Sequence, residues 1–386
     1  MQFLVAESET PDEREARRES AGKSSGETYA ATLEQMRPGC TITIVAPADE
    51  DPLPLTPQEI AAFDAVFVTG SPLHVYDDTP EVRRQLAFMR AVFASGVPSF
   101  GSCAGLQLAV VAAGGRVRKM ADRLEAGIAR RIVATDAGRA HSLLAGRPAV
   151  WDAPGIHGDE VETLPSDADL LASNAVAHVQ AAEIRHRGSV FWGVQYHPEL
   201  AIGEIAAALR RQSASLIESG LAHDGTQVEM LADQLDHLHR APEDRSLKWL
   251  LGVDDQFARE DRRRTEIGNF LANLALLRRN EENTMPQTLS ASFDTRREAE
   301  MTIERLVQDH GFERSDIFVA AEGEDNSAGL EIAGSDRESA QPSPETRDDA
   351  ALQGRIKVSV DIQDDDRAET VRAAFAEFDA EHVDVA

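Results

Sequence analysis

A cysteine stands where a short apolar run, residues 97–100, meets a helical pattern. Gly101 and Gly105 lie two residues before and after Cys103, and in such a G-x-C-x-G turn they leave room for a sharp strand-to-helix reversal. The turn exposes the thiol at the edge of a sheet, and the helix that follows directs unpaired N–H groups at the sulfur. The pattern therefore predicts that Cys103 is a nucleophile.

A candidate base occurs much later in the chain, where a β-branched and aromatic run ends in His197, Pro198 and Glu199. A histidine beside a proline at the end of a strand is, by itself, more often part of a turn than a base. Together with an exposed thiol in the same fold, it supplies the imidazole that a cysteine nucleophile needs, and Glu199 supplies a carboxylate to orient the ring. We therefore expect Cys103, His197 and Glu199 to form a catalytic triad.

Two further segments, residues 68–72 and 155–159, complete a resemblance to a known family. With the two segments above, they make residues 1–215 resemble the class I glutamine amidotransferase family, and most of all the glutaminase domain of GMP synthases. In that family the segment similar to 68–72 is the oxyanion loop, and the segment similar to 155–159 is an H-G-D motif. All four pieces occur in the family's order.

The resemblance implies that Cys103 attacks the side-chain carboxamide of glutamine, that His197 shuttles the proton and that Glu199 orients it. Ammonia would leave, and the resulting thioester would be hydrolysed. The backbone N–H groups expected to form the oxyanion hole belong to Ser71 and Ala104, with Gly70 in the same loop. The residues expected to bind the substrate are Gln107, Gly105, His157 and Asp159.

Two positions depart from the family's pattern. The family usually has glycine where Ser71 stands and a bulkier residue where Ala104 stands. If the oxyanion loop needs a positive φ at residue 71, a serine would strain it by about 1 to 2 kcal/mol and weaken activity.

The elements that would position these residues alternate between apolar strand-like runs and helical patterns. Such alternation indicates an α/β fold with a mostly parallel mixed sheet and helices on both faces, which the resemblance makes flavodoxin-like. The first strands are expected at residues 3–6, 41–46, 65–69 and 97–100, and later ones at 168–172, 181–185 and 190–196. The polar stretch 10–27 is expected to be a mobile surface insertion, followed by a helix that ends at Pro38 and Gly39.

Two further parts follow the predicted amidotransferase domain at 1–215. Residues 216–284 form a helical extension whose apolar stripes are expected to dock on the preceding domain, although a dimer interface would have the same pattern. Residues 285–386 predict a small βαβ-βαβ domain of ferredoxin-like type, interrupted by a disordered acidic linker at 322–351. This last part resembles the small domain of bacterial heat-induced general stress proteins, in residues 291–294, 299–306 and 311–312.

Composition excludes several classes of function. The net charge of −28 argues against nucleic acid as a partner, because that binding depends on clustered Lys and Arg. Two cysteines, Cys40 and Cys103, are too few for a disulfide framework or a four-thiolate metal site. We expect no metal and no cofactor. No apolar stretch is long enough to span a membrane and no signal-peptide core is present, so the expected compartment is the cytoplasm.

Three functions remain open from the sequence. The first is a glutaminase that releases ammonia, possibly to a separate synthetase partner, because the chain has no pyrophosphatase loop or Walker lysine loop of its own. The second is a hydrolase that uses the same triad on a γ-glutamyl peptide or amine. The third is a non-catalytic, stress-linked binding protein. The sequence does not distinguish a homodimer from other assemblies.

Overall fold

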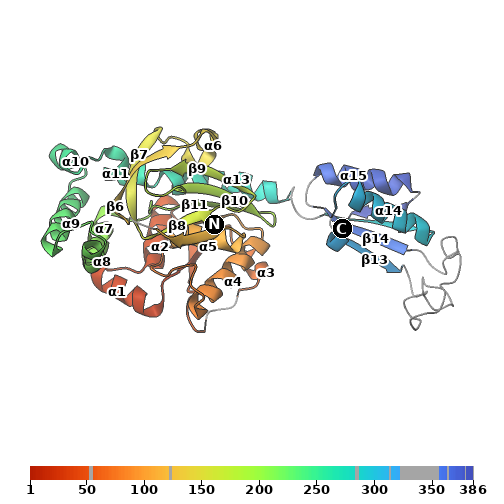
Figure 1. The fold of residues 1–386 in the computed structure, drawn as a ribbon, viewed down its shortest axis with the longest axis horizontal. Coiled ribbons are helices and arrows are strands. Elements are labelled where there is room, and N and C mark those ends of the chain that lie inside the picture. Colours follow the sequence, from red (N-terminus) through yellow and green to blue (C-terminus); the bar gives the residue numbers. More distant parts are fainter. Residues whose placement is uncertain are drawn as a thin grey trace. The chain divides into compact units, whose positions relative to one another are not determined.

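The chain divides into two compact units, Met1–Arg278 and Arg279–Ala386, in a computed structural model of all 386 residues (Figure 1). The structure describes residues 1–51, 55–120, 124–282, 287–312, 314–321, 356–362, 365–378 and 380–385. The acidic linker predicted at 322–351 lies outside the described residues.

The first unit is built on a nine-stranded mixed sheet with the order β2-β1-β3-β4-β11-β10-β9-β6-β7. The parallel strands are β2 (Thr41–Val45), β1 (Gln2–Ala6), β3 (Ala65–Val68), β4 (Ser99–Ser102) and β11 (Ser189–Val194). The antiparallel strands are β10 (Ala181–His186), β9 (Ala168–Ser173), β6 (Glu125–Ala134) and β7 (Val150–His157). A separate ribbon pairs β5 (Arg116–Lys119) with β8 (Asp159–Thr163).

The pairing of β4 with β11 determines where the site forms. These strands run parallel, and Ser102 at the end of β4 pairs with Val194 at the end of β11. Because parallel strands end at the same edge of a sheet, the residues that follow them emerge side by side. The cysteine turn and the His197 segment, distant in the sequence, therefore meet at one edge.

Helices cover both faces of this sheet, which confirms the predicted α/β class (Figure 1). On one face, α2 (Ser25–Met36) and α13 (Thr265–Glu282) pack in a core that includes Phe3, Phe67 and Phe270. On the other face, α4 (Pro80–Ala94) and α5 (Ala104–Ala112) pack in a second core. The shorter helices of this unit are α3 (Pro57–Ile60), α6 (Asp136–Ala140), α8 (Ser213–Glu218), α10 (Arg245–Leu251), α11 (Asp255–Ala258) and α12 (Glu260–Arg263).

The stretch 10–27, expected to be a mobile insertion, instead forms α1 (Pro11–Ala21) and the first turn of α2. Each helix begins with a capping box, in which Thr10 pairs with Glu13 and Ser24 pairs with Glu27. Such reciprocal bonds satisfy the free N–H groups of a helix start. The prediction failed because the charged residues were interpreted as an irregular segment, although their spacing is that of helix caps.

The apolar stripes of residues 216–284 are buried within the first unit. Val228 and Leu235 of α9 (Gly225–Arg240) pack against Ile205 and Leu209 of α7 (Ile202–Arg211). Phe270, with its neighbours on α13, packs on the sheet. The prediction that these stripes pack against the preceding residues is confirmed.

The second unit has a four-stranded antiparallel sheet with the order β13-β14-β12-β15. Its elements are β12 (Gln287–Phe293), α14 (Arg296–Gln308), β13 (Ile317–Ala321), β14 (Ile356–Ile362), α15 (Asp365–Glu377) and β15 (Glu381–Val385). Alternate residues of β12 and β14 are buried with both helices in one core. This order and connection confirm the predicted ferredoxin-like arrangement.

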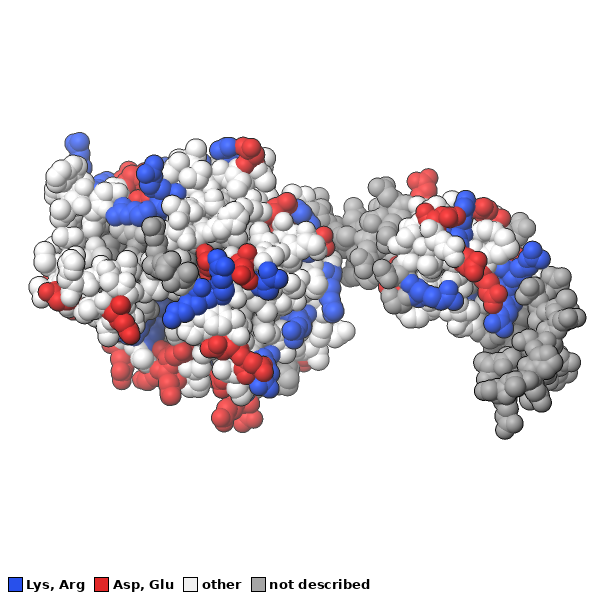
Figure 2. Space-filling view, in the orientation of Figure 1, with Lys and Arg blue, Asp and Glu red and all other residues white. Residues whose placement is uncertain are grey.

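Acidic and basic side chains are interspersed on the face of the first unit seen in Figure 2. Among the described residues, no helix combines the length and apolar character that crossing a membrane requires.

Candidate active site

Cys103 lies in a strained turn between β4 and α5. Its φ of 52° is in the left-handed region, which costs a residue with a side chain about 1 to 2 kcal/mol. A Cβ at Gly101 would lie 2.7 Å from the Phe191 ring, and one at Gly105 would lie 2.4 Å from the Val68 carbonyl oxygen. Both positions therefore need glycine, and the Gly105 contact shows that this residue lets α5 pack closely on β3.

His197 and Glu199 follow β11 and are both buried. The His197 Nδ1 atom lies 2.7 Å from Glu199 Oε1, and the His197 backbone N–H donates to the Pro154 carbonyl at 2.8 Å. Burial alone would lower the pKa of His197, but the charge of Glu199 and hydrogen bonds to Cys103 and Glu199 outweigh it and raise that pKa to about 10. The carboxylate beside the ring therefore stabilises the protonated form of the imidazole.

The Cys103 and His197 side chains both lie close to Gly70. A Cβ added to Gly70 would lie 2.7 Å from His197 Cε1 and 3.5 Å from Cys103 Cβ. The structure thus brings together all three residues expected to form the triad, and Gly70 is the residue that leaves space for the imidazole.

The two amides expected to form the oxyanion hole come from different elements. Ala104 begins α5, where an N–H group has no acceptor within the helix. Ser71 follows β3, and its hydroxyl accepts a hydrogen bond from the Leu73 N–H at 3.1 Å. Ser71 does not have a positive φ, so the strain considered for a serine in this loop does not arise.

Gln107 lies one turn of α5 beyond the cysteine, and its N–H donates to the Cys103 carbonyl at 3.1 Å. Its side-chain amide donates to the side-chain oxygen Oε1 of Gln195 at 3.2 Å and to the Asp159 backbone carbonyl at 3.3 Å. Gln195 was not anticipated as a site residue, and its own amide nitrogen is buried without a hydrogen-bond partner. Gln107 and Gln195 therefore place side-chain amide groups near the turn that carries Cys103, which we call the cysteine elbow.

Both ring nitrogens of His157 contact protein atoms. Nδ1 lies 2.8 Å from the Asp159 backbone carbonyl and Nε2 lies 2.9 Å from Glu125 Oε2. The Glu125 carboxylate also accepts hydrogen bonds from Asn174 and Gln180, each at 2.6 Å. His157 therefore supports the backbone of Asp159 and has no ring nitrogen left for a substrate.

The buried carboxylate of Asp159 contacts the loop that follows Ser71. Oδ2 lies 2.6 Å from His74 Nδ1, and Oδ1 accepts a hydrogen bond from the Tyr76 hydroxyl at 3.1 Å. The two rings stack with centroids 5.3 Å apart. Burial and the charge of Asp159 raise the pKa of Tyr76 to about 12, so its hydroxyl stays a donor. His74, which the sequence analysis did not single out, thus contacts the candidate site through Asp159.

Two residues that the sequence did not single out, Ser102 and Tyr29, form a chain of hydrogen bonds that ends at Glu199. The Ser102 hydroxyl donates to Glu199 Oε2 at 2.8 Å, and the Tyr29 hydroxyl bonds to Ser102 Oγ. Ser102 could have been suspected, because it adjoins the nucleophile and has a hydroxyl group. Tyr29 has no signal in the sequence, since only the tertiary fold brings α2 beside the end of β4.

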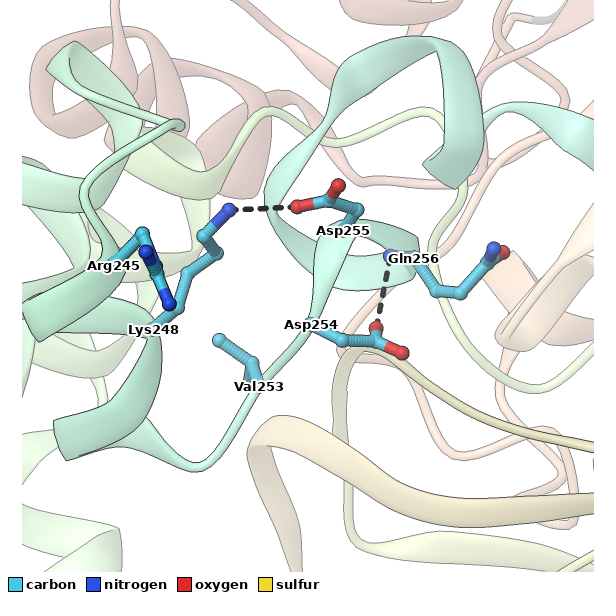
Figure 3. Close-up of a pocket in the computed structure, with 6 residues that line it drawn as sticks. All are labelled: Arg245, Lys248, Val253, Asp254, Asp255 and Gln256. Carbon is cyan, nitrogen blue, oxygen red and sulfur yellow. Dashed lines mark hydrogen bonds and ion pairs between the residues drawn. The ribbon is translucent and has the colours of Figure 1, made fainter.

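Two cavities lie away from these residues. One, of about 480 Å³, is lined by residues of α10 and α11 with the loop between them (Figure 3). Its Lys248 and Asp255 form an ion pair at 2.7 Å, so these two charges satisfy each other. A second, largely apolar cavity of about 460 Å³ borders Glu125. In the described part of the chain, no three His, Cys, Asp or Glu side chains are grouped so that they could hold a metal ion.

Comparisons with known proteins agree with this geometry. The family described as "Glutamine amidotransferase class-I" matches residues 23–214. A γ-glutamyl-L-1-hydroxyisopropylamide hydrolase from a Pseudomonas species is 36% identical over 238 residues, which are 61% of this chain and 80% of that protein. A glutamine-hydrolysing GMP synthase from Leifsonia xyli subsp. xyli is 32% identical over 174 residues, or 44% of this chain.

The chain spans only 32% of that GMP synthase. A solved structure of a glutamine amidotransferase from Thermotoga maritima has a TM-score of 0.47 and 15% identity, and the match covers 71% of this chain and 97% of that one. The match to the family over residues 23–214, and the 36% identity to a relative of which the chain covers 80%, establish the family of this chain. The chain belongs to the class I glutamine amidotransferase family, whose members are cysteine-nucleophile amide hydrolases.

Proposed function

We propose that this protein hydrolyses the γ-carbonyl amide bond of a γ-glutamyl compound through Cys103, His197 and Glu199. The observation that carries the proposal is the position of a buried, carboxylate-bound imidazole beside a cysteine in a nucleophile elbow. An imidazolium that contacts a sulfur atom favours the thiolate, which is the form that attacks a carbonyl carbon.

The reaction proceeds in two halves. The Cys103 sulfur attacks the γ-carbonyl carbon, and the N–H groups of Ser71 and Ala104 stabilise the negative charge that develops on the oxygen. The C–N bond then breaks as His197 gives its proton to the departing nitrogen, which leaves a thioester. In the second half, His197 takes a proton from water, the hydroxide attacks the thioester, and glutamate is released with the thiolate restored.

The glutamyl end of the substrate fits the polar wall beside the elbow. A γ-glutamyl group carries an α-ammonium, and the buried Asp159 carboxylate supplies the opposite charge. A carboxylate has acceptor sites beyond those used by His74 and Tyr76. The Gln107 side chain, from the helix that follows Cys103, donates to the Asp159 backbone carbonyl. We therefore assign substrate binding to Asp159 and Gln107, with His157 as their support.

The group beyond the amide nitrogen separates two candidates. A γ-glutamyl amine is favoured by the relative of which the chain covers 80%, a γ-glutamyl-L-1-hydroxyisopropylamide hydrolase. Glutamine is the second candidate, favoured by the matches to glutamine-hydrolysing GMP synthases. In that case the released ammonia would pass to a separate synthetase subunit.

The test is the release of product from glutamine, from a γ-glutamyl alkylamide and from a γ-glutamyl dipeptide, under the same conditions. Cys103→Ser is expected to abolish release, whereas Cys40→Ser, which changes the other cysteine, should retain it. Faster turnover of the alkylamide than of glutamine would support the first candidate, and the reverse order would support the second. No release from any of them by the wild-type protein would overturn the proposal.

A further inference from the structure

The second oxygen of Glu199 is occupied by a chain of two buried hydroxyl groups. While Oε1 contacts His197, Oε2 accepts the hydrogen bond from Ser102, whose oxygen in turn contacts the Tyr29 hydroxyl. Ser102 and Tyr29 are fully buried and Glu199 is 3% exposed. Water therefore does not compete for these three groups.

The direction of these bonds follows from the number of protons. An ionised carboxylate only accepts, so the single Ser102 proton is directed to Glu199, and Ser102 must accept from Tyr29. Burial and the charge of Glu199 raise the pKa of Tyr29 well above its usual value, so the phenol keeps its proton. The hydrogen bonds thus run from Tyr29 to Ser102 and from Ser102 to Glu199. A second donor, His197 Nδ1–H, binds the other oxygen of the same carboxylate.

Resting on the function proposed above, we propose that Ser102 and Tyr29 are positioning residues that hold the Glu199 carboxylate aimed at His197. Without a donor at Oε2, the carboxylate would be free to rotate about its terminal bond and lose its alignment with the imidazole. The same strand end that presents Cys103 would then also fix the acid of the triad.

Helix α2 supports this arrangement at two more points. The Thr32 hydroxyl donates to the Glu199 backbone carbonyl at 3.4 Å, and the Thr28 hydroxyl donates to Glu204 Oε1 at 2.7 Å. Thr28, Tyr29 and Thr32 lie on one face of the helix, because residues three and four apart are neighbours on a helix surface. Helix α2 is therefore fastened to the segment that follows His197.

A purely structural reading would make Ser102 a polar residue that happened to find a partner in the core. Ser99 provides the comparison, because it lies on the same strand, is equally buried and has a hydroxyl without any hydrogen-bond partner. Strand β4 thus accommodates a buried serine without such a bond. This makes Ser99→Ala the matched control for Ser102→Ala.

The first experiment follows the protonation of His197 by NMR in the full chain, with the signal assigned from a His197→Gln variant. In Ser102→Ala and in Tyr29→Phe, a less firmly held carboxylate should lower the pKa of His197 by about one unit, whereas Ser99→Ala should leave it unchanged. This measurement needs no substrate, so it tests the inference even if the proposed reaction is wrong.

The second experiment measures kcat and KM for the γ-glutamyl compound that turns over. Ser102→Ala should lower kcat about tenfold with little change in KM, which is the size expected for one hydrogen bond to a charged group. Its effect should largely disappear in a Glu199→Gln background, because Ser102 acts through Glu199. The inference would be overturned if Ser102→Ala and Tyr29→Phe, both folded, matched Ser99→Ala in the His197 titration and in kcat.

Discussion

The Asp159 carboxylate lies 2.6 Å from His74 Nδ1. This contact joins the start of β8 to the loop after β3. Both segments border the cysteine elbow, the first through Gln107 and the second through Gly70. The proposed substrate-binding acid is thus held by the loop that carries a proposed oxyanion amide. On the proposed function, binding of the glutamyl end and stabilisation of the reacting carbonyl are coupled through this contact.

Replacing Asp159 should affect binding more than chemistry. Asp159→Asn removes the charge proposed to meet the α-ammonium, so KM is expected to rise about tenfold or more, with kcat within a few-fold of wild type. Asp77→Asn, an exposed position in the neighbouring loop, is the matched control and should leave both parameters unchanged. Steady-state kinetics measure both. An unaltered KM in Asp159→Asn would remove this residue from the binding site.

Gly70→Ala should impair catalysis through a steric contact. The new methyl group would lie 2.7 Å from His197 Cε1, so the ring must move away from Cys103, and kcat should fall at least tenfold. Gly225→Ala provides the control, because its methyl group would approach nothing closer than 3.9 Å and its φ is not positive. If Gly70→Ala retained wild-type kcat, the imidazole could not be required at its present position.

His197 should make the stability of the first unit depend on pH. Its pKa is raised to about 10 in the folded protein and is about 6.5 in an unfolded chain. The stabilisation by its proton is therefore complete below about pH 6.5 and is lost as the pH rises through 10. We expect the difference in unfolding free energy between wild type and His197→Gln to shrink over this range.

Urea unfolding followed by tryptophan fluorescence measures this difference, because all three tryptophans, Trp151, Trp192 and Trp249, lie in the first unit. His178→Gln, at an exposed position, is the matched control variant. A constant difference for His197→Gln between pH 6 and 10 would contradict the raised pKa.

The buried ion pair of Arg147 and Glu266 should be costly to break. Both side chains are almost fully buried, and Arg147 binds Glu266 through two hydrogen bonds of 2.7 Å. Arg147→Met leaves Glu266 buried without its cation and should reduce the unfolding free energy by about 3 to 5 kcal/mol. The exposed pair Arg18 and Glu27 is the comparison, where Arg18→Met should cost far less because water screens the two charges.

A double variant separates charge from packing in this pair. Arg147→Met with Glu266→Met should be more stable than Arg147→Met alone, because no unpaired charge remains. Urea unfolding of the four proteins gives these values. A loss for Arg147→Met as small as that for Arg18→Met would show that this pair does not hold α13 to the loop before β7.

Much of the candidate site was predictable from local sequence. The elbow could be predicted because a strained turn between a strand and a helix requires glycine at Gly101 and Gly105, and the coordinates show the contacts that require it. Strand and helix patterns predicted the α/β class, because burial on a sheet imposes an apolar period that a linear sequence retains. Helix α1 was missed because its capping box lies in a strongly charged stretch.

The partners of the predicted residues depended on the tertiary structure. The sequence by itself determined which side chains could perform the chemistry, since Cys103, His197 and Glu199 stand in motifs that are local. Only the fold decided that Tyr29 reaches Ser102, that Ser102 reaches Glu199 and that His74 reaches Asp159, because these contacts join residues 73 to 97 positions apart. Hydrogen bonds of a few ångströms across such separations follow from the packing of whole helices and strands, which no local pattern records.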